Sequence, residues 1–165
     1  MSYFLDQWVD REFAPVAAKL FRSLFYLNMD EGNRAYFLAV KNGDPAKSRS
    51  VVLNGIKAIR DPKQAKELAR EALVKLTTFD RLLAKSGGPF VLGEHPSHCD
   101  SAIFGWYVTS QINPEINSLL WRNEAVPHVK AWSEAMEKAI KFKSPFTVDD
   151  KQKKEELVKE LEATA

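Results

Sequence analysis

Apolar residues recur at steps of three and four along most of the chain, which is the period of an amphipathic helix. In the first segment the recurring positions are Phe4, Leu5, Trp8, Val9, Phe13, Val16, Leu20, Phe21 and Leu24. This pattern predicts one long helix that ends near Asn28. Pro15 lies inside it and lacks a backbone N–H, so we expect a kink or a tightened turn there.

The next part of the chain predicts a short helix and then an irregular segment. The helix is expected over about residues 30–41, because "KNGDP" follows, where Gly43 can adopt the left-handed conformation and Pro45 can open a new turn. Residues 46–61 predict only a helical turn and a loop. "SRSVVLNG" within them has some strand character, but it is too short and isolated to found a sheet.

The second half of the chain predicts three further helices. A long amphipathic helix is expected over about residues 65–83, ended by Gly87 and Gly88. Residues 97–112 are apolar on nearly every side, which predicts a helix buried at the centre of the fold. Another helix is expected over about residues 127–142. The fold class predicted from the pattern is therefore all-α.

Length and composition predict one domain with a charged end. The chain has 165 residues, 45% of them hydrophobic, which suffices for one well-cored domain. We assign residues 1–145 to this helical domain. Residues 146–165 are predicted to form a charged C-terminal tail or marginal helix, with only Leu157, Val158 and Leu161 as large apolar side chains to bury.

Charge and cysteine content exclude several classes of partner. The net charge is +2, from 24 basic and 22 acidic residues scattered along the sequence, so no broad positive field attracts nucleic acid or an anionic membrane. No apolar run approaches the roughly 20 residues that span a bilayer, and no signal peptide is evident. Because a single cysteine forms no internal disulfide, we expect a cytoplasmic protein.

The stretch "HPSHCDS" carries the candidate chemistry, and a nucleophilic Cys99 is one interpretation of it. Such a cysteine needs a base within hydrogen-bond reach. On a helix, adjacent residues point to different faces, so His98 and Asp100 do not easily converge on it. A helix N-terminus can favour a thiolate, which keeps a reactive Cys99 as an alternative to a small buried residue.

Metal binding is a second interpretation of the same stretch. His95, His98 and Cys99 are ligand types, but their spacing fits no structural zinc pattern, and His128 lies far along the chain. We therefore expect no metal site.

A capping box is the third interpretation. Ser97 is followed three residues later by Asp100, immediately before the apolar helix. In such a box the serine oxygen accepts the backbone N–H of the third helical residue, and the carboxylate reaches back to the N–H of the serine. The strongest local signal is therefore structural.

The sequence "GGPFVLGEHPSHCDSAIFGWY" resembles the start of the central helix in the C-terminal domain of glutathione transferases. The residues that carry the resemblance are Phe90, Leu92, Gly93, Pro96, Ser97 and Asp100. "WVDREFAPVAAKLF" and "VPHVKAWSEAME" extend it over about residues 3–142, with fungal and etherase-like members most similar. The resemblance implies a helical bundle like that of the transferase C-terminal domain, with a central buried helix and a buried capping aspartate.

In that family the helical domain contributes the pocket for a hydrophobic, electrophilic co-substrate. The matching residues here are Tyr3, Gln7, Trp8, Arg11, Phe104 and Tyr107. The last two are equally well explained as core residues, since aromatics at helical spacing usually pack. The family's catalytic residue and most of its glutathione site lie in a thioredoxin-like domain, for which this sequence shows no βαβ pattern. The catalytic residue is thus unknown, no bound cofactor is expected, and glutathione could serve as co-substrate.

The resemblance leaves three functional classes open. The chain is expected to be the helical half of a glutathione transferase, with its first helix covered by a thioredoxin-like domain or by a second copy in a dimer. One alternative is a stand-alone interaction or assembly module. The other is an enzyme or carrier that uses the small-molecule pocket without glutathione.

Overall fold

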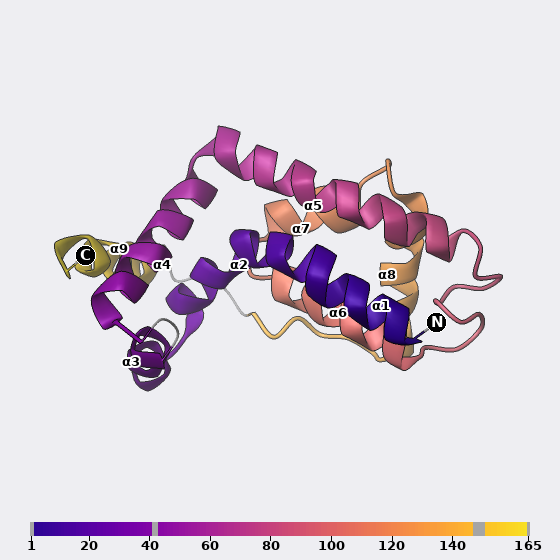
Figure 1. Ribbon diagram of the computed structural model, residues 1–165, viewed down its shortest axis with the longest axis horizontal. Helices are drawn as coiled ribbons and strands as arrows, with labels where there is room; N and C mark the ends of the chain where they lie inside the picture. The colour runs from indigo at the N-terminus through magenta and orange to yellow at the C-terminus, as the bar shows by residue number, and fades with distance from the viewer. Residues whose placement is uncertain (1, 41–42, 147–150, 165) are drawn as a thin grey trace. The chain divides into compact units, whose positions relative to one another are not determined.

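The computed structural model describes residues 2–40, 43–146 and 151–164, and its regular elements are helices. In chain order they are α1 (Ser2–Trp8), η1 (Val9–Phe13), α2 (Ala14–Asn28), α3 (Glu31–Val40), α4 (Pro45–Arg60), α5 (Pro62–Leu83), α6 (His98–Ser110), α7 (Pro114–Trp121), α8 (Pro127–Ala139) and α9 (Lys151–Thr164) (Figure 1). These described residues contain no β-strand, and Phe90 and Gly93 form one isolated bridge. The prediction of an all-helical chain is confirmed.

Contacts group the chain into two compact units. The first comprises Met1–Ala18 and Glu67–Phe146, and the second comprises Lys19–Lys66 and Thr147–Ala165. The boundaries fall within α2 and within α5. Within the second unit the C-terminal helix α9 packs against α4.

The first segment is interrupted just before Pro15, at Val9–Phe13, by a turn that is wider than an α-helical one. The residues of η1 form a π-helical turn, in which the Ala14 N–H donates to the Val9 carbonyl five residues earlier. The proline ring crowds the carbonyl four residues before it, and a π-turn gives that carbonyl more room. The expected tightened turn is therefore a wider one, between two α-helical segments.

Helix α4 replaces the predicted turn and loop over residues 46–61. Asp44 caps it by accepting the backbone N–H groups of Ala46 at 2.9 Å and Lys47 at 3.4 Å, and Pro45 occupies the first turn. The helix buries Ser48, Val52, Leu53 and Ile56. The strand-like "SRSVVLNG" is thus the middle of a helix.

Helix α7 was not predicted, although it begins in the same way as α4. Asn113 Oδ1 accepts the Ile116 N–H at 3.1 Å, and Pro114 follows the cap. The helix buries Ile116, Leu120 and Trp121. Its eight residues are too few to show a helical period clearly.

The second unit has its own apolar core. It is formed by Tyr26, Leu27, Phe37, Val52, Leu53, Ile56, Leu157, Val158 and Leu161. Helix α4 contacts both α3 and α9. On α9, Glu155 pairs with Arg60 at 2.6 Å, and the three apolar residues that the sequence offered for burial are in the core.

Helix α6 lies at the centre of the first unit and contacts α1, α7 and α8 (Figure 1). On this helix only the first residue, His98, and Ser101 and Gly105 are exposed. The surrounding core is aromatic, with Trp121 and Trp132 fully buried and their ring centroids 6.1 Å apart. The predicted burial of this helix on most of its surface is confirmed. Among the described residues, no helix is both long and apolar enough to cross a membrane.

Candidate functional site

The residues predicted to bind a small molecule occupy two different environments. Tyr3 is 77% exposed and Arg11 is exposed, whereas Gln7 is half-buried. Phe104 and Tyr107 are buried in the core of the first unit. The structure therefore aligns the first group along α1 and η1 but does not bring the two residues of α6 to that surface.

Phe4 extends the surface of α1, since it is 74% exposed. We call Tyr3, Phe4, Gln7 and Arg11 the α1 face. Trp8, the remaining predicted residue of this helix, is half-buried. Its ring stacks on Phe13 at a centroid distance of 5.7 Å and on Phe79 at 6.3 Å. Trp8 thus anchors the helix that carries this face to the core.

Asp100 organises the start of α6. Its side chain is completely buried and accepts four hydrogen bonds. Oδ2 accepts the backbone N–H of Ser97 at 2.8 Å and its hydroxyl at 2.6 Å, as part of the capping box. Oδ1 accepts the Val91 N–H at 2.9 Å and the Trp132 Nε1–H at 2.8 Å. One carboxylate therefore ties the preceding loop and α8 to the central helix.

The neighbours of Cys99 do not form a catalytic group with it. The thiol is buried, whereas His98 is exposed and approaches Asp6 at 3.7 Å. Asp100 is occupied by its four donors. Over the described ranges no three potential ligand side chains gather around a metal position. Cys99 is thus a small buried residue, which the sequence offered as the alternative to a reactive thiol.

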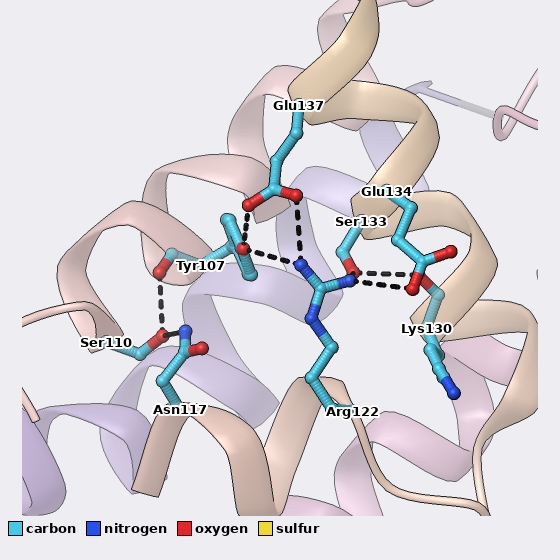
Figure 2. Close-up of polar contacts among 8 residues, drawn as sticks. All are labelled: Tyr107, Ser110, Asn117, Arg122, Lys130, Ser133, Glu134 and Glu137. Carbon is cyan, nitrogen blue, oxygen red and sulfur yellow. Dashed lines mark hydrogen bonds and ion pairs between the residues drawn. The ribbon is translucent and has the colours of Figure 1, made fainter. Parts of the chain in front are cut away.

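A polar network joins α6, the end of α7 and α8 within the first unit (Figure 2). The Tyr107 hydroxyl donates to Glu137 Oε1. Arg122 Nη2 donates to the Tyr107 oxygen at 3.1 Å and to Glu137 Oε2 at 2.9 Å. Arg122 Nη1 contacts Ser133 Oγ at 3.0 Å and Glu134 Oε1 at 3.2 Å. The guanidinium therefore crosslinks two helices with all of its charge compensated.

Tyr107 acts in this network as a neutral donor. Its ring packs on Phe104 at 5.0 Å and on Trp121 at 5.6 Å. Burial, followed by the hydrogen bond to Glu137, raises the pKa of Tyr107 to about 12. A phenol that stays protonated throughout the physiological range holds structure and does not serve as a general base. The network is thus a crosslink within the bundle.

The raised pKa of Tyr107 predicts a loss of stability at alkaline pH. Below pH 10 the phenol is protonated in both the folded and the unfolded chain, so it makes its full contribution to the free energy of unfolding. Between its ordinary pKa of 10.0 and about 12, the unfolded chain releases the proton while the folded one retains it, and stability falls. Between pH 9 and pH 11, we expect the free energy of unfolding, measured with urea, to fall by roughly 1 kcal/mol more in wild type than in Tyr107→Phe. The same pH dependence in both proteins would contradict this assignment.

Sequence reasoning missed Arg122, Ser133, Glu134 and Glu137. The two glutamates are three residues apart on α8, a spacing that places them on one helix face. Their partner lies at the end of α7, which was not predicted. No sequence pattern therefore indicated that Arg122 pairs with these two glutamates.

No protein-family model, curated protein or solved structure matches the chain.

Proposed function

We propose that this chain is the helical, co-substrate-binding half of a glutathione transferase-like protein. In this proposal the α1 face contacts a hydrophobic electrophile, and a thioredoxin-like half, on whichever chain carries it, holds glutathione. The observation that supports it most is Asp100. It is a fully buried carboxylate at the start of a central helix, where the resemblance places a capping aspartate.

The chemistry of the α1 face suits such a ligand. Tyr3 and Phe4 are adjacent aromatic side chains with most of their surface in solvent, and exposed apolar groups of this size commonly mark binding surfaces. Arg11 supplies a permanent positive charge that could stabilise negative charge developing on an electrophile. The surface therefore offers an apolar contact on α1 and a hydrogen-bond donor on η1, which follows it directly.

Calorimetric titration with two ligands tests the proposal. S-hexylglutathione carries an apolar tail for the α1 face, whereas glutathione lacks it. We expect the first to bind with a Kd on the order of 0.1–1 mM and the second to give no detectable heat. Binding of neither ligand would contradict the proposal. Equal binding of both would contradict the division of contacts between the two halves.

A stand-alone assembly module is the second candidate, and the same aromatic pair favours it. A second copy packed on Phe4 would remove its ring from water. Sedimentation equilibrium should then give a mass above the 18.7 kDa of one chain. Phe4→Ser should restore the monomer, whereas Tyr36→Ser, at a site 67% exposed on α3, should not. A monomer at high concentration would exclude this candidate.

A further inference from the structure

A pocket of about 480 Å³ lies in the second unit, lined by residues of α2, α3 and α9. Its volume is in the range of small-molecule sites. The ionisable groups that line it are three carboxylates, Glu31, Glu156 and Glu160, and one guanidinium, Arg34. The ring of Tyr26 and the side chain of Leu157 provide apolar surface. The pocket therefore combines an excess of negative charge with an apolar wall.

The hydroxyl of Tyr26 is a polar group of the pocket lining that could bind a ligand. Tyr26 is only 7% exposed, and its ring packs on Phe37 at a centroid distance of 6.3 Å. Within the described residues its hydroxyl makes no hydrogen bond. Burial raises the pKa of Tyr26, so the phenol is neutral, and its oxygen can accept a hydrogen bond from a ligand. Because Tyr26 lines the pocket, a bound ligand can supply a hydrogen-bond partner for this hydroxyl.

Some charged groups in and near the pocket have a partner within the protein, and others have none among the described residues. Arg34 Nη1 donates to the Met29 carbonyl at 2.6 Å, which fixes the guanidinium on the end of the preceding segment. On α9, Glu162 pairs with Lys57 at 3.5 Å. By contrast, Glu31 and Glu160 enter no ion pair among the described residues. These two carboxylates are available to a cation in the pocket.

We infer that this pocket binds a small primary ammonium ion with a short apolar body. The ammonium group has three N–H donors, which match the acceptors offered by Glu31, Glu160 and the Tyr26 hydroxyl. The hydrocarbon part lies against Leu157. An anion of the same shape is rejected, because Glu31 and Glu160 outnumber the single guanidinium of Arg34 and leave the pocket negative.

Calorimetric titration of the full chain with 2-phenylethylamine tests this site, with 3-phenylpropionate as the anion of similar shape. The amine should bind and the carboxylate should not. Glu160→Gln should weaken amine binding at least tenfold, and Tyr26→Phe about threefold. Glu162→Gln, on the same helix but paired with Lys57, should leave the affinity unchanged.

Circular dichroism of each variant confirms that it is folded before titration, and Glu160 is exposed enough for the substitution to be tolerated. Three results would overturn the inference. They are no detectable heat at about 10 mM amine, equal binding of amine and carboxylate, or an affinity that Glu160→Gln does not change.

Discussion

Replacing Asp100 by alanine should remove about 4 kcal/mol from the free energy of unfolding, because four donors lose their acceptor at once. The Val91 N–H and the Trp132 Nε1–H are buried, so water cannot readily replace the carboxylate there. The two donors of Ser97 are partly buried. Urea unfolding followed by tryptophan fluorescence measures the loss.

Two further variants test whether the loss of stability comes from the hydrogen bonds of the Asp100 carboxylate. Asp100→Asn keeps one acceptor oxygen but turns the other position into a donor, so its loss should be intermediate. Asp10→Ala, at an exposed carboxylate of η1, should change stability by less than about 0.5 kcal/mol. A loss below about 1 kcal/mol for Asp100→Ala would show that the buried carboxylate does not hold α6 in place.

Gly88→Ala should cost about 3 kcal/mol, the second largest effect we expect. A Cβ atom at this position would lie 2.5 Å from the carbonyl carbon and oxygen of Gly93 and 3.0 Å from Glu94 N. These are backbone atoms, so no side-chain rotation relieves the clash. The loop must shift, and with it the Val91 N–H that reaches Asp100. Urea unfolding again measures the effect.

Gly105→Ala is the matched control for Gly88. Gly105 lies within α6, and an added Cβ would meet nothing within 4 Å. Alanine is favoured over glycine in a helix interior, so this variant should gain up to about 1 kcal/mol. If Gly88→Ala were as well tolerated as Gly105→Ala, the close packing of the loop on itself would be contradicted.

The helical period predicted the elements with a strong apolar pattern, but not two others. Helices α5, α6 and α8 lie within a few residues of their expected positions. Helices α4 and α7 were missed, although each begins with an Asx–Pro pair, Asp44–Pro45 and Asn113–Pro114. These pairs combine a capping side chain with a residue suited to the first turn. Pro45 indicated a new turn at the start of α4 but not the length of that helix, and the same cap chemistry at Asn113 would have located the start of α7.

Contacts within the site were predictable only where they are local. Ser97 and Asp100 are three residues apart, so the sequence indicated their capping box. The bond from Trp132 to Asp100 spans 32 residues, and that from Arg122 to Glu137 joins different helices. Periodicity likewise identified Phe4 as apolar but could not show that it is exposed. Such features depend on which helices pack together.

The affinity for S-hexylglutathione, compared between wild type and the double variant Tyr3→Ala/Phe4→Ala, tests the central claim most directly. Both side chains are exposed, so their removal should leave the fold intact. We predict at least a tenfold loss of affinity, about 1.4 kcal/mol, with Tyr36→Ala unchanged as the matched control. Equal affinity in wild type and the double variant would contradict a co-substrate site on the α1 face.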